Sequence, residues 1–348
     1  MIPSLAEKEI SILGKRYLPE LEISLKSKIP VSNSKFFGSM RYHLGWESFD
    51  GTLVSLDTGK RLRPLLCLAS CEISGGNWRS AIPAATALEL IHNFSLLHDD
   101  VQDGDRTRRG RATVWTIFGI GQAIAAGNGM RVVADQTMFG VNNSNIARTS
   151  AIAASEELTL RYLEMIEGQY LDMSFESANT ISTDQYLDMI SRKTGALIEA
   201  SMHIGSIIAT GNKDFAQTFG KCGRSLGLAF QIRDDLLGIW GDPSLTGKAV
   251  GADIRRKKKS LPIVFLFQHA SKDDQCWLSN AYKKDTVSES EVLDILELME
   301  KLKVREYVQK EAEKNAEIAI NSISRLGISH DSLKSIEAIA KFFTTRNK

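Results

Sequence analysis

An all-α fold is predicted by two features of this sequence. Only 7 prolines occur in its 348 residues, and none lies between Pro83 and Pro243. Because proline breaks a helix from inside, so long a stretch without it favours long helices. Apolar residues also recur at three- and four-residue steps, and segments that alternate in the manner of a β-strand are few.

The helices are expected where this spacing is clearest. In residues 81–103 the apolar positions Leu88, Ile91, Phe94, Leu97 and Val101 fall on one helical face. The same spacing predicts helices over residues 152–176, 184–210, 215–240 and 290–325. Breaks are expected where glycine, asparagine and serine gather, at residues 75–77, 140–145, 179–184 and 211–212. Composition shows no boundary, so we expect a single all-α domain over residues 1–348.

The bulk composition excludes some classes of function. A formal net charge of +1 gives no general attraction to nucleic acid or to a membrane surface. The four cysteines form no CxxC pair, which disfavours a zinc site or a disulfide. The start of the chain lacks the apolar run of a signal peptide, and no transmembrane segment is expected. These features predict a cytoplasmic protein.

The first acidic cluster is the sequence HDDVQDGDRTRRG at residues 98–110. On a helix Asp99 and Asp103 lie about 40° apart, and His92 falls on the same stripe, with Asp100 beside it. Carboxylates at this spacing suit Mg²⁺, which keeps several waters and is completed by substrate phosphates. The arginines that follow could bind phosphate in a bidentate manner. The alternative is a solvated helix end, whose surface ion pairs contribute less than about 1 kcal/mol each.

The second acidic cluster is FQIRDDLLGIWGD at residues 230–242, near the end of another apolar helix. Asp253 and a basic run at residues 255–259 follow it, and such a run by itself is usually a solvated face. A helical Gly195 after Lys193 and Thr194 indicates a local kink or a close approach. The segment LDTGKRLRP at residues 56–64 is a further candidate anion site, or an ordinary basic helix start.

The motifs GKRLRP, DDxxD with RRG, GQxxD, KTG, FQxxDD and GKxxGxD occur here in this order. The set resembles the trans-isoprenyl (polyprenyl) diphosphate synthases over residues 55–265. The resemblance implies a homodimeric isoprenoid-synthase helical bundle around a central cavity, with the two aspartate motifs facing each other across its mouth. It also implies three Mg²⁺ ions per active site, bound to the diphosphate of an allylic substrate.

The resemblance assigns roles residue by residue. It implies that metal is bound by Asp99, Asp103 and Asp234, with Asp100 assisting. The allylic diphosphate would be contacted by Arg108, Lys193, Gln231, Lys248 and Lys258. Isopentenyl diphosphate would be held by Lys60, Arg63, His92 and Arg109. The Thr194 hydroxyl and the Gln231 side chain would face the allylic carbocation, and no protein nucleophile is needed.

Three positions depart from the family pattern. Gly238 stands where a third aspartate is usual, Asn128 where Gly-Asp is often found, and Lys257 where glycine is common. We still expect metal binding at Asp234 and Asp235. A terpene cyclase is disfavoured because position 238 is glycine and the basic motifs are present. A non-catalytic subunit of a heteromeric synthase stays an alternative, whereas a helical scaffold leaves the paired clusters unexplained.

Product length in this family depends on the residues four and five places before the first aspartate, here Ser95 and Phe94. Ser95 leaves space one helical turn below Asp99, whereas Phe94 limits depth. With no insertion in the first motif, the pattern is most similar to geranylgeranyl diphosphate synthases. Farnesyl or longer products are the alternatives.

Overall fold

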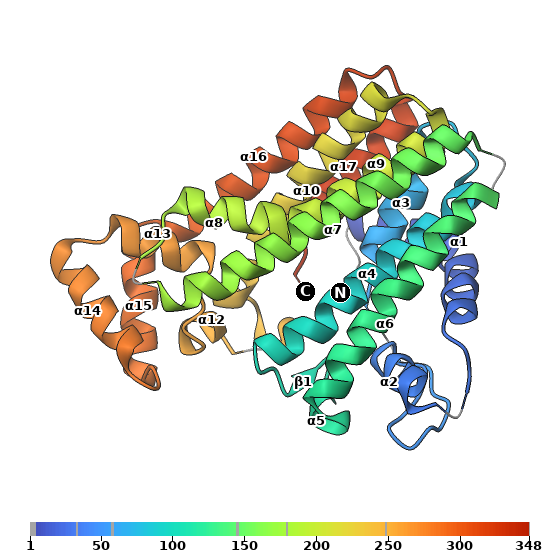
Figure 1. Cartoon of the computed structure of the whole chain (residues 1–348). Coiled ribbons are helices and arrows are strands. Elements are labelled where there is room, and N and C mark those ends of the chain that lie inside the picture. Colours follow the sequence, from blue (N-terminus) through green and yellow to red (C-terminus); the bar gives the residue numbers. More distant parts are fainter. Residues whose placement is uncertain are drawn as a thin grey trace. The chain divides into compact units, whose positions relative to one another are not determined.

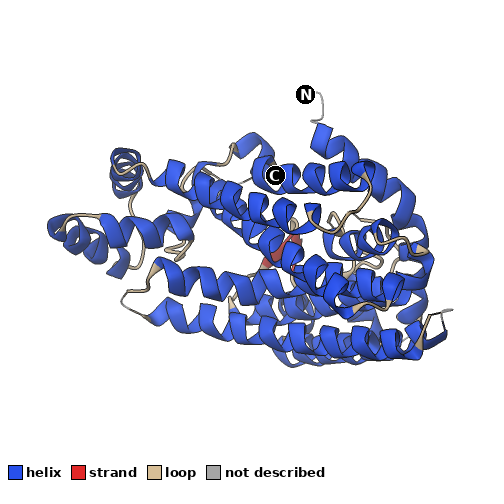
Figure 2. Cartoon of the chain, turned by 90° about the horizontal axis from the view of Figure 1, so that it is seen from above, coloured by secondary structure: helices blue, strands red, loops and turns tan. Residues whose placement is uncertain are grey.

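The computed structural model describes residues 5–32, 34–56, 59–143, 146–178, 180–247 and 249–347, so Lys248 lies outside the described residues. Most of these residues are helical and strands are almost absent among them (Figures 1 and 2), which confirms the all-α prediction. Within the described part, the one sheet is the two-stranded antiparallel hairpin of β1 (Thr107–Arg108) and β2 (Arg111–Ala112). No helix of the described residues is both long enough and apolar enough to cross a membrane.

The chain divides into two compact units. The first unit comprises Ser11–Leu163 and Leu197–Gly220, and the second comprises Met1–Ile10, Glu164–Ala196 and Lys221–Lys348. Their boundaries fall within α1 (Leu5–Lys28), α7 (Arg148–Ser177) and α10 (Lys213–Trp240), and at the start of α9 (Ala196–Thr210). The single domain over residues 1–348 stays a prediction.

The first unit is built around α4 (Ile82–Gln102), which agrees with the helix predicted over 81–103. Pro83 lies in its first turn, where the missing N–H costs no hydrogen bond. α4 packs against α6 (Ile120–Met138) and α3 (Leu62–Ile73) (Figure 1). Also in this unit are α2 (Lys35–His43), η1 (Trp78–Ala81), α5 (Val114–Phe118), η2 (Phe139–Asn143), the β1–β2 hairpin, nearly all of α9, and parts of α1, α7 and α10.

The second unit has its core between α10 and the C-terminal helices, with Ile232, Leu236 and Leu261 among its buried residues. Its other helices are α8 (Thr183–Ile190), α11 (Pro243–Thr246), α12 (Ala252–Arg255), α13 (Leu261–His269), α14 (Lys272–Lys283), α15 (Glu289–Lys301), α16 (Val304–Ser324) and α17 (His330–Thr345). The single helix predicted over 290–325 was wrong. The chain turns at Lys303, whose φ of 54° is left-handed and ends the run between α15 and α16.

The helix predicted over 184–210 is also interrupted. Ser191–Gly195 (η3) forms a π-helical turn between α8 and α9, which confirms the irregularity expected at Gly195. A Cβ at Gly168 of α7 would lie 2.2 Å from the backbone nitrogen of Lys193. Only glycine therefore lets α7 approach this turn so closely. The turn carries Lys193 and Thr194, so the irregular backbone sets the position of two predicted site residues.

Candidate active site

The first acidic cluster ends α4. The Asp103 N–H donates a hydrogen bond to the Asp99 carbonyl oxygen over 2.8 Å, so the two residues lie one turn apart, as predicted. Asp99 is half-buried and Asp103 is exposed. Carboxylates at the C-terminal end of a helix meet the negative end of its dipole, which disfavours them. Their placement is unfavourable for the helix and suits a bound cation.

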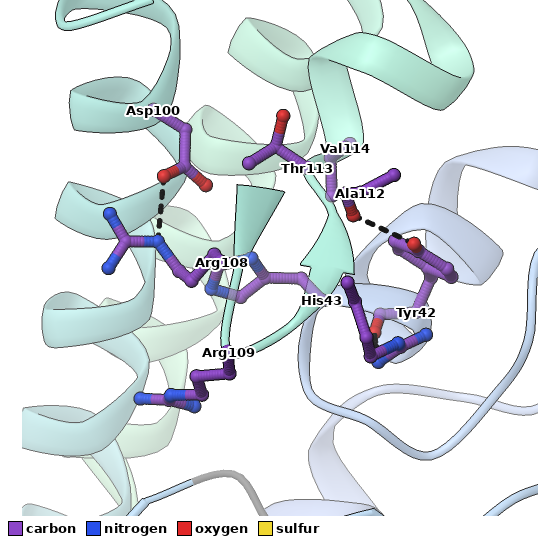
Figure 3. Close-up of a pocket in the computed structure, with 9 residues that line it drawn as sticks. Tyr42, His43, Asp100, Arg108, Arg109, Ala112, Thr113 and Val114 are labelled. Atoms are coloured by element: carbon purple, nitrogen blue, oxygen red, sulfur yellow. Dashed lines mark hydrogen bonds and ion pairs between the residues drawn. The ribbon is translucent and has the colours of Figure 1, made fainter. Parts of the chain in front are cut away.

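Asp100 differs from its neighbours because it is almost fully buried, with 1% of its surface exposed. The Arg108 Nε donates to its Oδ1 over 2.7 Å, whereas its buried Oδ2 has no hydrogen-bond partner (Figure 3). Burial raises the pKa of Asp100 to about 6 against the opposing charge of Arg108. Asp100 therefore holds Arg108 through Oδ1, and its Oδ2 is a hard oxygen donor that could contact a cation.

The β-hairpin positions both arginines that follow the acidic motif. Arg109 and Gly110 both have positive φ, 52° and 73°, as a two-residue primed turn requires. The Tyr42 hydroxyl donates to the Ala112 carbonyl over 2.8 Å, and Arg111 donates to the Tyr42 carbonyl over 3.0 Å (Figure 3). The glycine of the RRG motif thus makes the turn, and α2 anchors the hairpin.

Positive charges gather around His92. Burial lowers its pKa well below the usual range, and the charges of Arg63, Arg109, Arg108 and His43 lower it further. The imidazole is therefore neutral, and it lies among the arginines that the sequence assigned to diphosphate binding. The structure thus brings together Arg63 of GKRLRP, His92 of α4 and the RRG arginines.

The backbone of the GKRLRP segment lies close to Arg109 of the RRG motif. A Cβ at Gly59, where φ is 99°, would lie 3.0 Å from the Arg109 Nη2. Lys60 is exposed just before α3, and Arg63 lies in the first turn of that helix. Arg61 has a structural role instead, since it is buried and pairs with Glu89 over 2.5 Å. Arg61, which lies between Lys60 and Arg63 in the sequence, thus stabilises the fold.

His43 was missed by the sequence reasoning because α2 carries no recognisable motif. Burial and the charges of Arg108 and Arg109 lower its pKa to about 3, while Asn93 opposes the shift. It lines a cavity of about 30 Å³ together with Asp100, Arg108 and Arg109 (Figure 3). A cavity of that size holds roughly one water molecule.

The residues predicted to limit product length lie below Asp99 on α4. Phe94 is 7% exposed and its ring meets the His98 ring edge-on, with centroids 4.9 Å apart. The Ser95 hydroxyl donates to the His92 carbonyl over 2.8 Å. Phe94 is therefore fixed by packing, whereas the hydroxyl of Ser95 is bound to a carbonyl of its own helix.

The two adjacent aspartates of the second acidic cluster, Asp234 and Asp235, lie in different environments. Asp235 is 1% exposed and accepts hydrogen bonds from the Tyr186 hydroxyl at 2.6 Å, the Leu261 N–H at 3.1 Å and the Gln231 amide at 3.1 Å. Burial raises the pKa of Asp235 to about 6, although the charge of Lys258 lowers it. Asp235 is thus an internal anchor, and the side chain of Asp234 is 40% exposed.

The KTG motif contacts both the second acidic cluster and the GQxxD motif. The Thr194 hydroxyl donates to the Gln231 Oε1 over 2.9 Å, and the Lys193 Nζ lies 2.5 Å from an Asp172 oxygen. Gln231 is therefore held at both ends of its amide. Desolvation lowers the pKa of Lys258, but the charges of Asp235, Asp253, Asp172 and Asp234 outweigh it, so that the pKa is raised.

The comparisons with known proteins identify the family. The polyprenyl synthetase family profile matches residues 52–299. The chain belongs to the polyprenyl synthetase family. It is therefore an enzyme that transfers prenyl groups.

Relatives of this polyprenyl synthetase differ in the product that they are named for. A (2E,6E)-farnesyl diphosphate synthase of Mycobacterium tuberculosis is 36% identical over 308 residues, covering 88% of this chain and 84% of that protein. A geranylgeranyl diphosphate synthase of Sulfolobus acidocaldarius is 35% identical over 291 residues, covering 83% and 88%. A polyprenyl synthetase from Streptomyces coelicolor has a solved structure with a TM-score of 0.88 at 33% identity, covering 97% and 99% of the two chains.

One residue of the synthetase's second cluster could not be found from sequence. Arg346, just after α17, forms an ion pair with Asp234, and its guanidinium lies 3.9 Å from the centre of the Phe230 ring. The Arg346 carbonyl accepts a hydrogen bond from Arg233 over 2.9 Å. The sequence offered no signal for this contact beyond one basic residue near the end of the chain. The C-terminal region, in which the sequence showed no chemistry, thus reaches a predicted metal ligand.

The donors fit a hard divalent cation that brings its own waters. Among the described residues, no group of three or more His, Cys, Asp or Glu side chains is arranged to hold a metal by itself. Mg²⁺ is commonly bound by one or two carboxylates together with substrate phosphates, so such a cage is not required. Asp99, Asp103 and Asp234 provide exposed or half-buried carboxylates of this kind.

Proposed function

We propose that this polyprenyl synthetase condenses isopentenyl diphosphate with an allylic diphosphate, head to tail, and releases geranylgeranyl diphosphate. The observation that supports it most is the set of arginines around neutral His92, which lies two turns of α4 before Asp99. Asp100 already pairs with Arg108 among these cations, and a diphosphate would add further negative charge to the same cluster.

Isopentenyl diphosphate is proposed to bind in the first unit. Lys60, Arg63 and Arg109 would contact its phosphate oxygens, and the N-terminus of α3 adds the positive end of a helix dipole. His92, neutral before binding, can donate an N–H to a phosphate oxygen. The hairpin turn fixes the backbone of Arg109, so only its side chain has to be ordered on binding.

Mg²⁺ is the proposed cofactor, with three ions per active site. Asp99 and Asp103 would hold ions in the first unit and Asp234 in the second, while Asp100 acts by holding Arg108. When bound, the ions stabilise the negative charge that develops on the departing diphosphate. Arg108 adds a fixed cation to the same task.

The allylic partner is proposed to be bound by residues of the second unit together with Arg108. Lys193, Lys258, Gln231 and Lys248 would contact its diphosphate. The Thr194 hydroxyl donates its hydrogen to Gln231, so the lone pairs of the Thr194 oxygen can face a carbocation. Cleavage of the allylic carbon–oxygen bond would release diphosphate and leave the carbocation, which the isopentenyl double bond attacks to form the new carbon–carbon bond. The isopentenyl unit would then lose a proton to the released diphosphate.

The product is proposed to be geranylgeranyl diphosphate because Phe94 limits the depth below Asp99, while Ser95 leaves space. The relatives include both farnesyl and geranylgeranyl synthases, so farnesyl diphosphate is the second candidate. Incubating the protein with labelled isopentenyl diphosphate and each allylic primer tests this directly. A C20 product supports the proposal, and a product that stops at C15 replaces it with the second candidate.

We also propose a cytoplasmic homodimer. Large apolar side chains are exposed on α6, on η2 and on the first-unit part of α7, namely Ile120, Ile124, Val132, Phe139, Ile152, Leu160 and Leu163. Exposed apolar residues gathered on neighbouring elements mark association surfaces. Light scattering coupled to size-exclusion chromatography should give twice the chain mass, and a monomer at micromolar concentration contradicts the proposal.

A further inference from the structure

A cavity of about 500 Å³ lies within the second unit. It is formed by the end of α7, residues 180–181, the segment between α12 and α13, and the helices α13 and α14. None of its described lining residues is among those predicted to bind substrate or metal. Pockets that take small organic ligands measure about 300–1,000 Å³, so this cavity is large enough for one.

One wall of the cavity is apolar. Ile263 and Val264 of α13 are 1% and 3% exposed, and Phe267 follows one helical turn later. The Phe267 ring meets the Tyr282 ring of α14 edge-on, with centroids 5.3 Å apart. The Tyr282 hydroxyl is buried and has no hydrogen-bond partner within the described part of the chain. An unpaired buried hydroxyl costs about 1–3 kcal/mol, which an acceptor on a bound molecule could offset.

The cavity also carries an excess of positive charge. Lys257, Lys259 and Lys283 line it, and Glu176 is the one acidic residue among its described lining residues. The Lys259 ammonium donates to carbonyls at the end of α7, and the Lys257 ammonium donates to the Lys284 carbonyl over 2.7 Å. These acceptors are neutral, so they hold the ammonium groups in place without cancelling their charge.

Lys257 stands where glycine is common in the family pattern, and its backbone has the conformation that favours glycine. Its φ of 53° is left-handed, which costs a residue with a Cβ about 1–2 kcal/mol. The chain accepts this cost and places a cation on the cavity wall. A purely structural role would need only the hydrogen bond to the Lys284 carbonyl, whereas a binding role needs the charge as well.

We propose that this cavity binds a small amphipathic anion, a molecule with an aromatic or aliphatic body and one carboxylate or sulfonate group. The body would pack against Val264 and Phe267, and the acidic group would lie beside Lys257 and Lys283. A divalent cation does not suit lining residues whose one described carboxylate is that of Glu176. A wholly apolar ligand would desolvate the lysines without pairing them. The site is additional to the proposed function and does not depend on it.

Two fluorescent probes with the same aromatic body test the proposal, since anilinonaphthalene sulfonate carries a sulfonate and N-phenylnaphthylamine lacks it. Lys257→Gln combined with Lys283→Gln keeps a hydrogen-bond donor at both positions. It should weaken binding of the sulfonate about fivefold and leave binding of the neutral probe unchanged. The matched control, Lys272→Gln with Lys301→Gln, removes the same charge from exposed positions outside the cavity and should alter neither.

Two further measurements locate the probes. Ser279→Phe adds a ring to the cavity wall on α14 and should abolish binding of both, with Tm showing that the variant is folded. Inorganic diphosphate with Mg²⁺ should displace neither, because the cavity shares no described lining residue with the predicted diphosphate sites.

Equal binding of the sulfonate in the cavity-lysine variant and its control overturns the proposal. Undiminished binding in folded Ser279→Phe overturns it too, as does displacement of the sulfonate by diphosphate. If Ser279→Phe does not fold, the lysine variants decide, because they leave the apolar wall intact. None of these measurements requires prenyl transfer, so failure of the proposed function is seen separately, as a chain that binds the sulfonate in the cavity but elongates no allylic diphosphate.

Discussion

Arg346 forms an ion pair with Asp234, which lies 112 residues earlier in the second unit. The guanidinium is almost fully buried, with 7% of the side chain exposed, and it lies over the Phe230 ring. Asp234 is the aspartate of this cluster that stays accessible, so its partner is a protein cation where the proposed function places a metal. Arg346 and a divalent cation therefore compete for the same carboxylate.

Replacing Arg346 with glutamine should tighten Mn²⁺ binding in the absence of substrate by about fivefold, the equivalent of about 1 kcal/mol for a partly exposed ion pair. Calorimetric titration measures the change. Lys341→Gln is the control, because it removes the same charge from an exposed position on α17 and should leave the affinity unaltered. Weaker or equal binding in Arg346→Gln would show that the arginine does not compete with the metal.

Asp99→Ala and Asp103→Ala should each reduce turnover by orders of magnitude. Both carboxylates lie at the negative end of the α4 dipole, which disfavours each by about 0.5 kcal/mol and so offsets part of any stability lost with their contacts. Steady-state rates and denaturant unfolding check the two effects together. Near-normal turnover in either variant would refute the metal assignment at that residue.

Phe94→Ala should lengthen the prenyl product beyond that of the unmodified enzyme. The ring is buried, so its loss also costs about 3–5 kcal/mol of stability. Product chain length is measured by chromatography at a temperature where the variant stays folded. Leu88→Ala, also at a buried position of α4, is the control for destabilisation alone. An identical product distribution in Phe94→Ala and the control would exclude Phe94 as the floor.

His43 makes the stability of the protein sensitive to acid. Its pKa falls from 6.5 to about 3 on folding, so between these pH values the unfolded chain binds a proton that the folded chain does not. Stability is therefore complete above about pH 6.5 and declines as the pH falls toward 3. From pH 7 to pH 5 the unmodified protein should lose about 2 kcal/mol more than His43→Gln. Equal losses in denaturant unfolding would contradict this, and exposed His330→Gln serves as the control.

The sequence predicted what depends on local spacing. The turn between Asp99 and Asp103, the helix that carries His92, and the irregular backbone at Gly195 all follow from residues within a few positions of one another. The glycine of RRG also has a local cause, since the hairpin turn needs its positive φ.

Properties that depend on distant partners could not be predicted. Asp234 and Asp235 are adjacent and chemically identical, yet only the fold buries Asp235 beneath Tyr186 and leaves Asp234 to Arg346. Likewise, the clash that excludes a side chain at Gly238 depends on Asp253 of a separate helix. The break at Lys303 was missed because the apolar spacing continues across it.

The most direct test is the reaction itself. Purified protein is incubated with labelled isopentenyl diphosphate, farnesyl diphosphate and Mg²⁺, and the chain length of the product is measured with and without EDTA. The proposed function predicts geranylgeranyl diphosphate, lost when EDTA removes the metal and absent in Asp99→Ala. No elongated diphosphate from any allylic primer, or a cyclised hydrocarbon in its place, would contradict it.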